Sequence, residues 1–229
     1  MKLKHFVLKD FAMKNRHTRL FEEDPPLYFL SGFAMNSYLL INGNSAVLID
    51  VGFSPEEIIE YLQANDLELK AILLTHAHLD HIGGIDEVRE VFDVPLFLHQ
   101  LEKSWLSDPV LNGSEFLPHF GKVTCKPTTI ELLSGDTVLE IDDFSFTVIH
   151  TPGHTPGGLC YLVNSWLFSG DSLFNRSIGR TDLFGGDSKA LLKSIKDKLF
   201  SLPNRVTVYP GHGEKTTIGE EKRLNPFVK

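Results

Sequence analysis

Residues 75–81 read THAHLDH and directly follow the apolar, strand-like run AILLT at 71–75. Three histidines and one aspartate within six residues have no simple packing explanation, because buried polar groups must each find a partner. His76 and His78 lie two residues apart, so extended backbone directs both side chains to the same side. Asp80 and His81 follow in an expected bend and can reach a second, neighbouring ion. The stretch therefore predicts a metal site at the end of a strand.

Three further segments, TPGHTPG (151–157), SGD (169–171) and YPGHG (209–213), also follow apolar, strand-like runs. Loops that leave one edge of a sheet system meet there, which is a common place for ligand-binding groups. Imidazole and carboxylate together suit zinc, iron or manganese. Seven candidate ligands are too many for one four-coordinate ion and suffice for two. We predict His76, His78 and His154 on one ion, Asp80, His81 and His212 on the other, and Asp171 as a bridge.

Strand and helix signals alternate along the rest of the chain. The Gly-Asn pair at 43–44 predicts a hairpin between strands at 37–42 and 46–51. Ser54 and Pro55 predict the start of a helix, with Ser54 as the N-cap and Pro55 in the first helical position. Other strands are predicted at 95–99, 137–141, 144–150, 158–163, 166–169 and 206–209, and other helices at about 85–92 and 188–200.

Residues 101–127 show little periodicity and predict a long surface excursion with a short helix, of the kind that forms lids or binding loops. Strand-rich segments with helices in both halves indicate an α/β fold whose helices pack outside the sheets. No linker-like stretch interrupts the pattern. We therefore expect a single domain over residues 1–229.

The composition excludes several classes of protein. The 229 residues are 42% hydrophobic and 23% charged, which is typical of a globular protein. The formal net charge of −8 disfavours non-specific binding to nucleic acid or to an anionic membrane. Two cysteines form no disulfide framework, and the N-terminal residues do not resemble a signal peptide. A cytoplasmic location is expected. The remaining histidines, His5, His17, His99, His119 and His150, are expected to have ordinary packing or hydrogen-bonding roles.

The four motifs, in this order, resemble those of the metallo-β-lactamase superfamily: THAHLDH (75–81), TPGHT (151–155), SGD (169–171) and PGH (210–212). The resemblance covers about residues 34–226. It implies a four-layer αββα sandwich, with two mixed β-sheets flanked by helices and the metals at one sheet edge. It also implies the same seven ligands.

Within the superfamily the chain is most similar to the short bacterial type of glyoxalase II-like (hydroxyacylglutathione hydrolase-like) enzymes. The additional matching segments are GRTD (179–182), GGD (185–187), TTIGE (216–220) and NPF (225–227). Full-length glyoxalase II enzymes continue into a helical domain that supplies much of the glutathione site. The chain ends at Lys229, so no C-terminal helical domain is expected.

This resemblance implies hydrolysis of a thioester or ester by a hydroxide that bridges two divalent ions, with zinc as the expected metal and iron or manganese also compatible. Asp80 is expected to orient the nucleophile as well as to bind metal. Arg180 and Asp182 are expected either to position the Asp171 loop without binding metal themselves or to form a structural salt bridge. The expected partner is a small-molecule thioester or ester, with no nucleic acid and no membrane; the sequence gives no prediction of the oligomeric state.

An alternative reading is a persulfide dioxygenase of the same fold, which the GRTD segment also resembles. Such enzymes use one iron held by two histidines and one aspartate, a role that His76, His154 and Asp171 could fill. His212 and the TTIGEE ending look more like the hydrolase branch. A nuclease is disfavoured by the charge of −8, a drug-hydrolysing lactamase by the lack of an export signal, and a degenerate metal-binding module by the complete ligand set.

Overall fold

The computed structural model describes residues 1–8, 34–126 and 129–229. The first sheet contains, in spatial order, β1 (Lys2–Leu8), β2 (Met35–Asn42), β3 (Ser45–Ile49), β4 (Glu68–Leu73), β5 (Leu96–His99) and β6 (Ile130–Leu133). The second contains β14 (Thr216–Thr217), β13 (Thr207–Pro210), β10 (Trp166–Gly170), β9 (Leu159–Val163), β8 (Phe144–His150) and β7 (Thr137–Ile141). A short hairpin joins β11 (Leu173–Phe174) to β12 (Ser177–Ile178).

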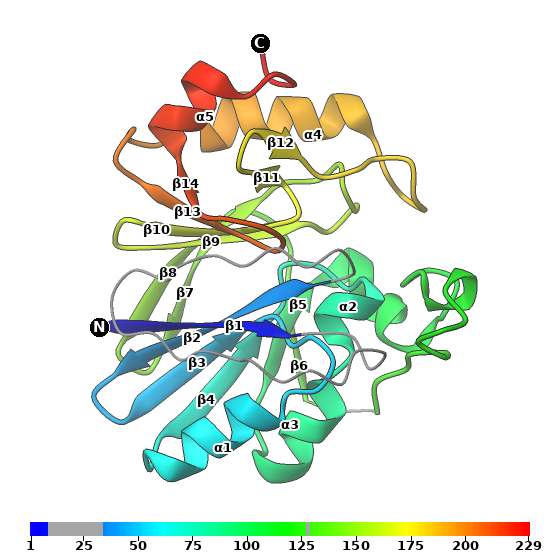
Figure 1. Cartoon of the computed structure of the whole chain (residues 1–229), viewed down its shortest axis with the longest axis vertical. Helices are drawn as coiled ribbons and strands as arrows, with labels where there is room; N and C mark the ends of the chain where they lie inside the picture. The colour runs from blue at the N-terminus through cyan, green and yellow to red at the C-terminus, as the bar shows by residue number, and fades with distance from the viewer. Residues whose placement is uncertain (9–33, 127–128) are drawn as a thin grey trace.

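Helices cover the outer face of each sheet. The described residues form the helices α1 (Glu56–Ala64), α2 (Leu79–Ile82), α3 (Ile85–Val91), α4 (Ser188–Ser194) and α5 (Ile218–Leu224). Figure 1 shows α1 and α3 against the first sheet and α4 and α5 against the second, with the two sheets between them. Both sheets contain parallel and antiparallel pairs. The predicted four-layer αββα sandwich is therefore confirmed.

Three apolar layers hold the sandwich together. The strand β3 illustrates why a central strand is apolar on both faces, since all its residues after Ser45 are apolar. Ala46 and Leu48 point into the layer beneath α1 and α3, whereas Val47 and Ile49 point into the layer between the two sheets. Successive side chains of a strand point to opposite faces, so a strand covered on both sides needs apolar residues at every position. Each fully buried aliphatic side chain of this kind contributes roughly 1.5–3 kcal/mol.

The hairpin at 43–44 is confirmed, with Gly43 at φ +63°. The predicted N-cap of this helix, Ser54, is wrong by one residue. Ser54 has φ +59°, and the N-cap is Pro55, whose carbonyl accepts hydrogen bonds from the amides of Ile58 and Ile59. An N-cap side chain requires extended backbone to reach the first turn, which the left-handed conformation of Ser54 does not provide.

The helix predicted at 85–92 is confirmed as α3, and the helix predicted at 188–200 is α4 followed by a π-helical turn, Ile195–Leu199. Asp80 and His81 lie in the one-turn helix α2 rather than in a simple bend. The edge strands β1 and β6 were not predicted. His17 lies outside the described residues.

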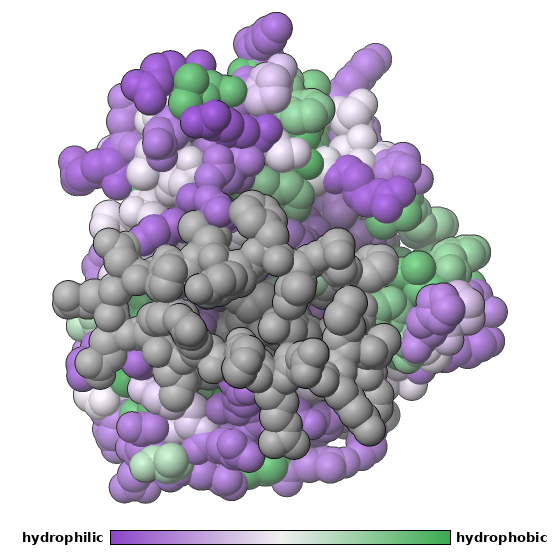
Figure 2. All heavy atoms as spheres, viewed as in Figure 1, coloured by the Kyte–Doolittle hydropathy of each residue, from purple (hydrophilic) through white to green (hydrophobic). Residues whose placement is uncertain are grey.

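The 101–127 excursion contains the predicted short helix, the 3₁₀ helix η1 (Gln100–Ser107), and a second turn, η2 (Ser114–Phe116). Figure 2 shows apolar side chains gathered on the side where this excursion projects, and Leu101, Val110 and Phe116 are exposed there. Nowhere in the described ranges is there a helix long and apolar enough to cross a membrane.

Candidate metal centre

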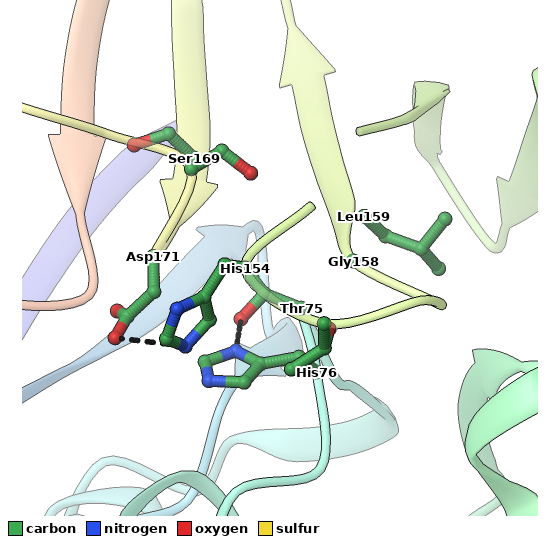
Figure 3. A pocket seen from close by; sticks show the side chains of 9 residues that line it. Thr75, His76, His154, Gly158, Leu159, Ser169 and Asp171 are labelled. Carbon is green, nitrogen blue, oxygen red and sulfur yellow. Dashed lines mark hydrogen bonds and ion pairs between the residues drawn. The ribbon is translucent and has the colours of Figure 1, made fainter. Parts of the chain in front are cut away.

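Four strand ends bring the seven predicted ligands together. The loop and one-turn helix after β4 carry His76, His78, Asp80 and His81, the loop after β8 carries His154, and Asp171 and His212 follow β10 and β13. Because β4 belongs to the first sheet and the other strands to the second, the cluster lies where the two sheets meet. Figure 3 shows His76, His154 and Asp171 lining one small pocket there.

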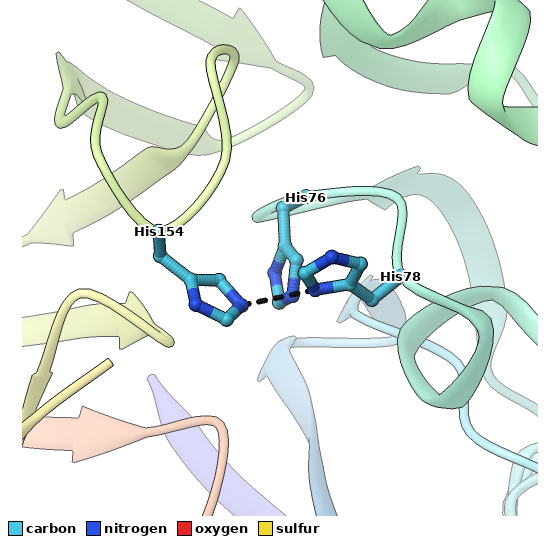
Figure 4. Close-up of side chains that lie close together, drawn as sticks. All are labelled: His76, His78 and His154. Atoms are coloured by element: carbon cyan, nitrogen blue, oxygen red, sulfur yellow. Dashed lines mark hydrogen bonds between the residues drawn. The ribbon is translucent and has the colours of Figure 1, made fainter. Parts of the chain in front are cut away.

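His76, His78 and His154 form one group, whose ligand atoms all lie within 4.8 Å of one another. Figure 4 shows the three rings pointing toward a common point, with His78 Nδ1 and His154 Nε2 2.9 Å apart. Burial, helped by the neighbouring histidines, lowers the pKa of His76 well below its usual value and that of His78 to about 3. His76 and His78 are therefore neutral at pH 7, which is the form that binds a metal ion.

Asp80, His81 and His212 form a second group with ligand atoms within the same distance, 4.8 Å. His212 Nε2 lies 3.2 Å from Asp80 Oδ2. Burial by itself would lower the pKa of His212, but Asp171 and Asp80 raise it to about 9. Burial would likewise raise the pKa of Asp80, but His81 and His212 lower it to about 2. This group therefore has paired charges, in contrast to the neutral rings of His76 and His78.

Asp171 lies between the two groups. Its Oδ1 is 3.4 Å from His81 Nε2, and its Oδ2 is 3.5 Å from both His154 Nε2 and His212 Nε2. It thus contacts one histidine of the first group and two of the second. This is the position that a bridging ligand requires, although its metal-binding role remains a prediction.

Unsatisfied buried atoms test whether a cation fits this cluster. His76 Nε2, His81 Nε2 and Asp171 Oδ1 are buried without a hydrogen-bond partner, and the same three residues make up a third group with ligand atoms within 4.8 Å. Leaving buried polar atoms unpaired is costly. Nitrogen and carboxylate oxygen are suitable ligands for zinc, iron or manganese. The residues present therefore fit divalent metal ions.

The second nitrogen of three of these imidazoles is fixed by another group. His154 Nδ1 donates to the carbonyl of Arg180 at 2.7 Å, and His212 Nδ1 donates to the carbonyl of Ala34 at 2.9 Å. His81 Nδ1 lies 2.9 Å from Asp50 Oδ2. Such contacts set the tautomer, so that Nε2 is left free to bind metal.

Asp50 was not anticipated from the sequence. Its side chain is buried, and besides His81 it accepts hydrogen bonds from the amide and the hydroxyl of Thr75, both at 2.7 Å. The available signal was its place directly after the apolar run AVLI of β3, the same arrangement that marked the four ligand segments.

Glu102 was also missed. It is buried in η1, and its two oxygens accept hydrogen bonds from the amides of Ala77 and Gly157. Burial outweighs these two hydrogen bonds, which lower its pKa, and the resulting pKa is raised to about 7. No sequence motif marks it, because its role depends on how the excursion folds back on the ligand loops.

Arg180 and Asp182 form a bidentate ion pair at 2.7 and 2.8 Å, with side chains 61% and 69% exposed. The group of this segment that contacts a predicted ligand is the backbone carbonyl of Arg180.

We therefore expect Arg180→Ala to change kcat/KM and metal content less than about threefold, because exposed ion pairs contribute only about 0–1 kcal/mol. Steady-state kinetics and elemental analysis check this, and a loss above tenfold would contradict it.

Comparison with known proteins agrees with this geometry. The family model of the metallo-beta-lactamase superfamily matches residues 31–212. A probable metallo-hydrolase of Bacillus subtilis, YqgX, is 46% identical over 195 residues, which cover 84% of this chain and 92% of the relative. The hydroxyacylglutathione hydrolase GloC of Haemophilus influenzae is 35% identical over 204 residues, which cover 87% of this chain and 95% of GloC.

Solved structures show the same architecture. The BLEG-1 B3 metallo-beta-lactamase superposes with a TM-score of 0.82 at 48% identity, covering 87% of this chain and 96% of that one. TTHA1623 in a di-iron-bound form gives 0.73 at 40% identity, covering 86% and 97%. ETHE1 from Myxococcus xanthus gives 0.69 at 29% identity, covering 88% and 82%. The chain therefore belongs to the metallo-β-lactamase superfamily and has its fold.

Proposed function

We propose that this protein hydrolyses the thioester or ester bond of a small molecule, as a hydroxyacylglutathione hydrolase-like enzyme with two divalent metal ions. The observation that carries the proposal is the position of Asp171, which contacts histidines of both ligand groups. A site for a single ion needs only one of these groups. The name of the GloC relative supports a thioester substrate, and zinc is the metal that we expect.

Divalent ions held here would lower the pKa of a bound water from 15.7 toward about 7 and polarise the acyl carbonyl. The residues themselves have distinct roles. The rings of His76, His78 and His154 would hold one ion, and Asp80, His81 and His212 would hold the other. The Asp80 carboxylate, 3.2 Å from His212 Nε2, would also orient the attacking water.

The leaving group fits this residue set. A thiol has a pKa of about 8.5, so a thiolate departs with little help from a general acid. The ligand motifs supply histidines and aspartates that we assign to the metals, and no further acid among them. Thioesters therefore suit the site better than substrates whose leaving group must be protonated.

The alternative function is that of a mononuclear-iron persulfide dioxygenase with His76, His154 and Asp171 as ligands. Iron is compatible with these side chains. The proximity of Asp80, His81 and His212 to Asp171 favours the hydrolase instead, because a mononuclear centre does not need them.

One experiment separates these functions. The purified protein is analysed for zinc, iron and manganese and is assayed with S-lactoylglutathione, a matched oxygen ester and glutathione persulfide. Two ions per chain with release of free thiol would support the proposal. One iron per chain with oxygen consumption on the persulfide would replace it by the dioxygenase. Bound metal without turnover of any thioester, ester or lactone would indicate a metal-binding module.

Apolar side chains adjoin the first ligand group and suggest where an acyl group binds. The ring centroids of Trp105 and His78 lie 5.6 Å apart, and those of Trp105 and Phe184 lie 6.0 Å apart in an edge-to-face arrangement. Phe184 is 58% exposed and the neighbouring Leu183 is 40% exposed. An apolar strip therefore leads from the surface to His78 and supports substrates with hydrocarbon character beside the reacting carbonyl.

We expect Phe184→Ala to raise KM for a hydrocarbon-bearing acyl thioester about three- to tenfold with little change in kcat. The reason is that part of the Phe burial of roughly 1.5–3 kcal/mol is lost on substrate binding. Phe227→Ala is the matched control, since Phe227 is 55% exposed on the segment after α5. Equal KM values for both variants and the parent protein would argue against this strip.

A further inference from the structure

The side chain of Glu102 connects the two loops that carry the first ligand group. Its Oε2 accepts a hydrogen bond of 2.6 Å from the amide of Ala77, the residue between His76 and His78. Its Oε1 accepts one of 2.8 Å from the amide of Gly157, in the loop after β8. The side chain is 1% exposed. One buried carboxylate therefore joins a loop of the first sheet to a loop of the second.

The 3₁₀ helix η1 positions Glu102 for this contact. It begins directly after β5, where the His99 side chain accepts a hydrogen bond from the amide of Leu101. Residues three apart lie on the same face of a 3₁₀ helix. Glu102 and Trp105 share that face, and Trp105 packs against the His78 ring. One face of η1 thus contacts the first ligand group in two ways. Glu102 binds backbone amides of the ligand loops, and Trp105 packs against the ring of His78.

The fit around this carboxylate leaves little freedom. A Cβ atom added at Gly157 would lie 2.9 Å from both Cγ and Oε1 of Glu102 and 3.0 Å from the Cβ of His99. Both oxygens of Glu102 face N–H donors. A carboxylate can accept from both, whereas the amide of a glutamine would direct its own NH₂ at one of them.

The second ligand group is held by a different carboxylate. Asp50 contacts His81 directly, and it reaches the first group only through the Thr75 hydroxyl, which lies 3.1 Å from His76 Nδ1. Asp50 thus supports residues of the loop after β4, whereas Glu102 joins that loop to the loop that carries His154.

We infer that Glu102 is a positioning residue that sets the distance between the His76–His78 loop and the His154 loop, and thereby the affinity of the first metal site alone. This inference rests on the proposed function in one respect, namely that these three histidines bind a metal ion. Partners that orient metal ligands typically change affinity by about 10–100-fold when they are replaced.

Titration of the apoprotein with Co²⁺ tests this inference, with the visible absorption spectrum and a competing chelator as readouts. We expect Glu102→Gln and Glu102→Ala to weaken one of two Co²⁺ equivalents by about 10–100-fold, Ala more than Gln, and to alter the spectrum of that equivalent. The other equivalent should bind as in the parent protein. Where the alanine variant fails to fold, the glutamine variant alone gives the result.

Glu221→Gln is the matched control. Glu221 is also fully buried and accepts hydrogen bonds from the amide of Arg176 at 2.9 Å and the hydroxyl of Thr216 at 2.7 Å, but it supports the C-terminal part of the chain. It should lose thermal stability while keeping both Co²⁺ affinities and the spectrum.

Two results would overturn the inference. One is a Glu102→Gln variant with parent-like affinities and spectrum, and the other is an equal loss of affinity in Glu221→Gln. Failure of the proposed function is a separate outcome, because it leaves Co²⁺ binding intact in the parent protein and abolishes only the hydrolysis of thioesters and esters.

Discussion

Asp171→Ala should reduce the tightly bound metal to less than one ion per chain and lower kcat/KM for a thioester by at least about 10³-fold. The reason is that Asp171 is within 3.5 Å of histidines from both ligand groups. Removing it leaves His81, His154 and His212 without the negative charge that they share. Elemental analysis and steady-state kinetics on the same preparation measure both effects.

Asp187→Ala is a suitable control for this variant. Asp187 caps α4 by accepting hydrogen bonds from the amides of Lys189 and Ala190, and loss of such a cap costs about 1 kcal/mol of stability. The control should therefore lose stability while retaining two ions and full activity. An Asp171→Ala protein that keeps both its metal and its turnover would refute the bridging assignment.

The clustering of the seven proposed ligands could be predicted from the sequence because each belongs to a short motif after an apolar strand. Strand ends that share an edge meet in space, so local sequence was sufficient to predict that His76, His154 and His212 would lie close together. The four layers were implied by the family resemblance. The apolar runs at 46–49 in β3 and 71–73 in β4 agree with them, because alternate residues there belong to two different core layers.

Other features depend on contacts that no local pattern encodes. The edge strand β6 has half-buried and exposed residues and is defined by its pairing with β5. Arg180 contacts His154 through its backbone carbonyl, which any residue could supply. The sequence drew attention instead to its side chain, which forms only an exposed ion pair with Asp182. Glu102 acquires its role only when η1 folds against two distant loops.

Asp50 is the support whose loss should have the second-largest effect. It accepts three buried hydrogen bonds, two from Thr75 and one from His81, and its backbone has φ +55°, a conformation that aspartate and asparagine tolerate better than most residues. Asp50→Ala leaves these donors unpaired. We expect it to lower the free energy of unfolding by about 3–5 kcal/mol, measured by denaturant titration.

Asp50→Asn tests the effect of Asp50 on the tautomer of His81 apart from its effect on packing, because asparagine has a similar volume and tolerates the positive φ. Its NH₂ group cannot accept the proton of His81 Nδ1, so the ring should adopt the tautomer with hydrogen on Nε2, the nitrogen that faces Asp171 at 3.4 Å. A protonated Nε2 cannot bind metal. We expect the second ion to bind about 10–100-fold more weakly, and nitrogen-detected NMR of the histidines to report the changed tautomer.

Asp142→Asn is the control, since Asp142 has φ +50° and bonds to Ser45 away from the cluster. If Asp50→Asn binds two ions as tightly as this control, then Asp50 supports the fold and does not set the ligand state of His81.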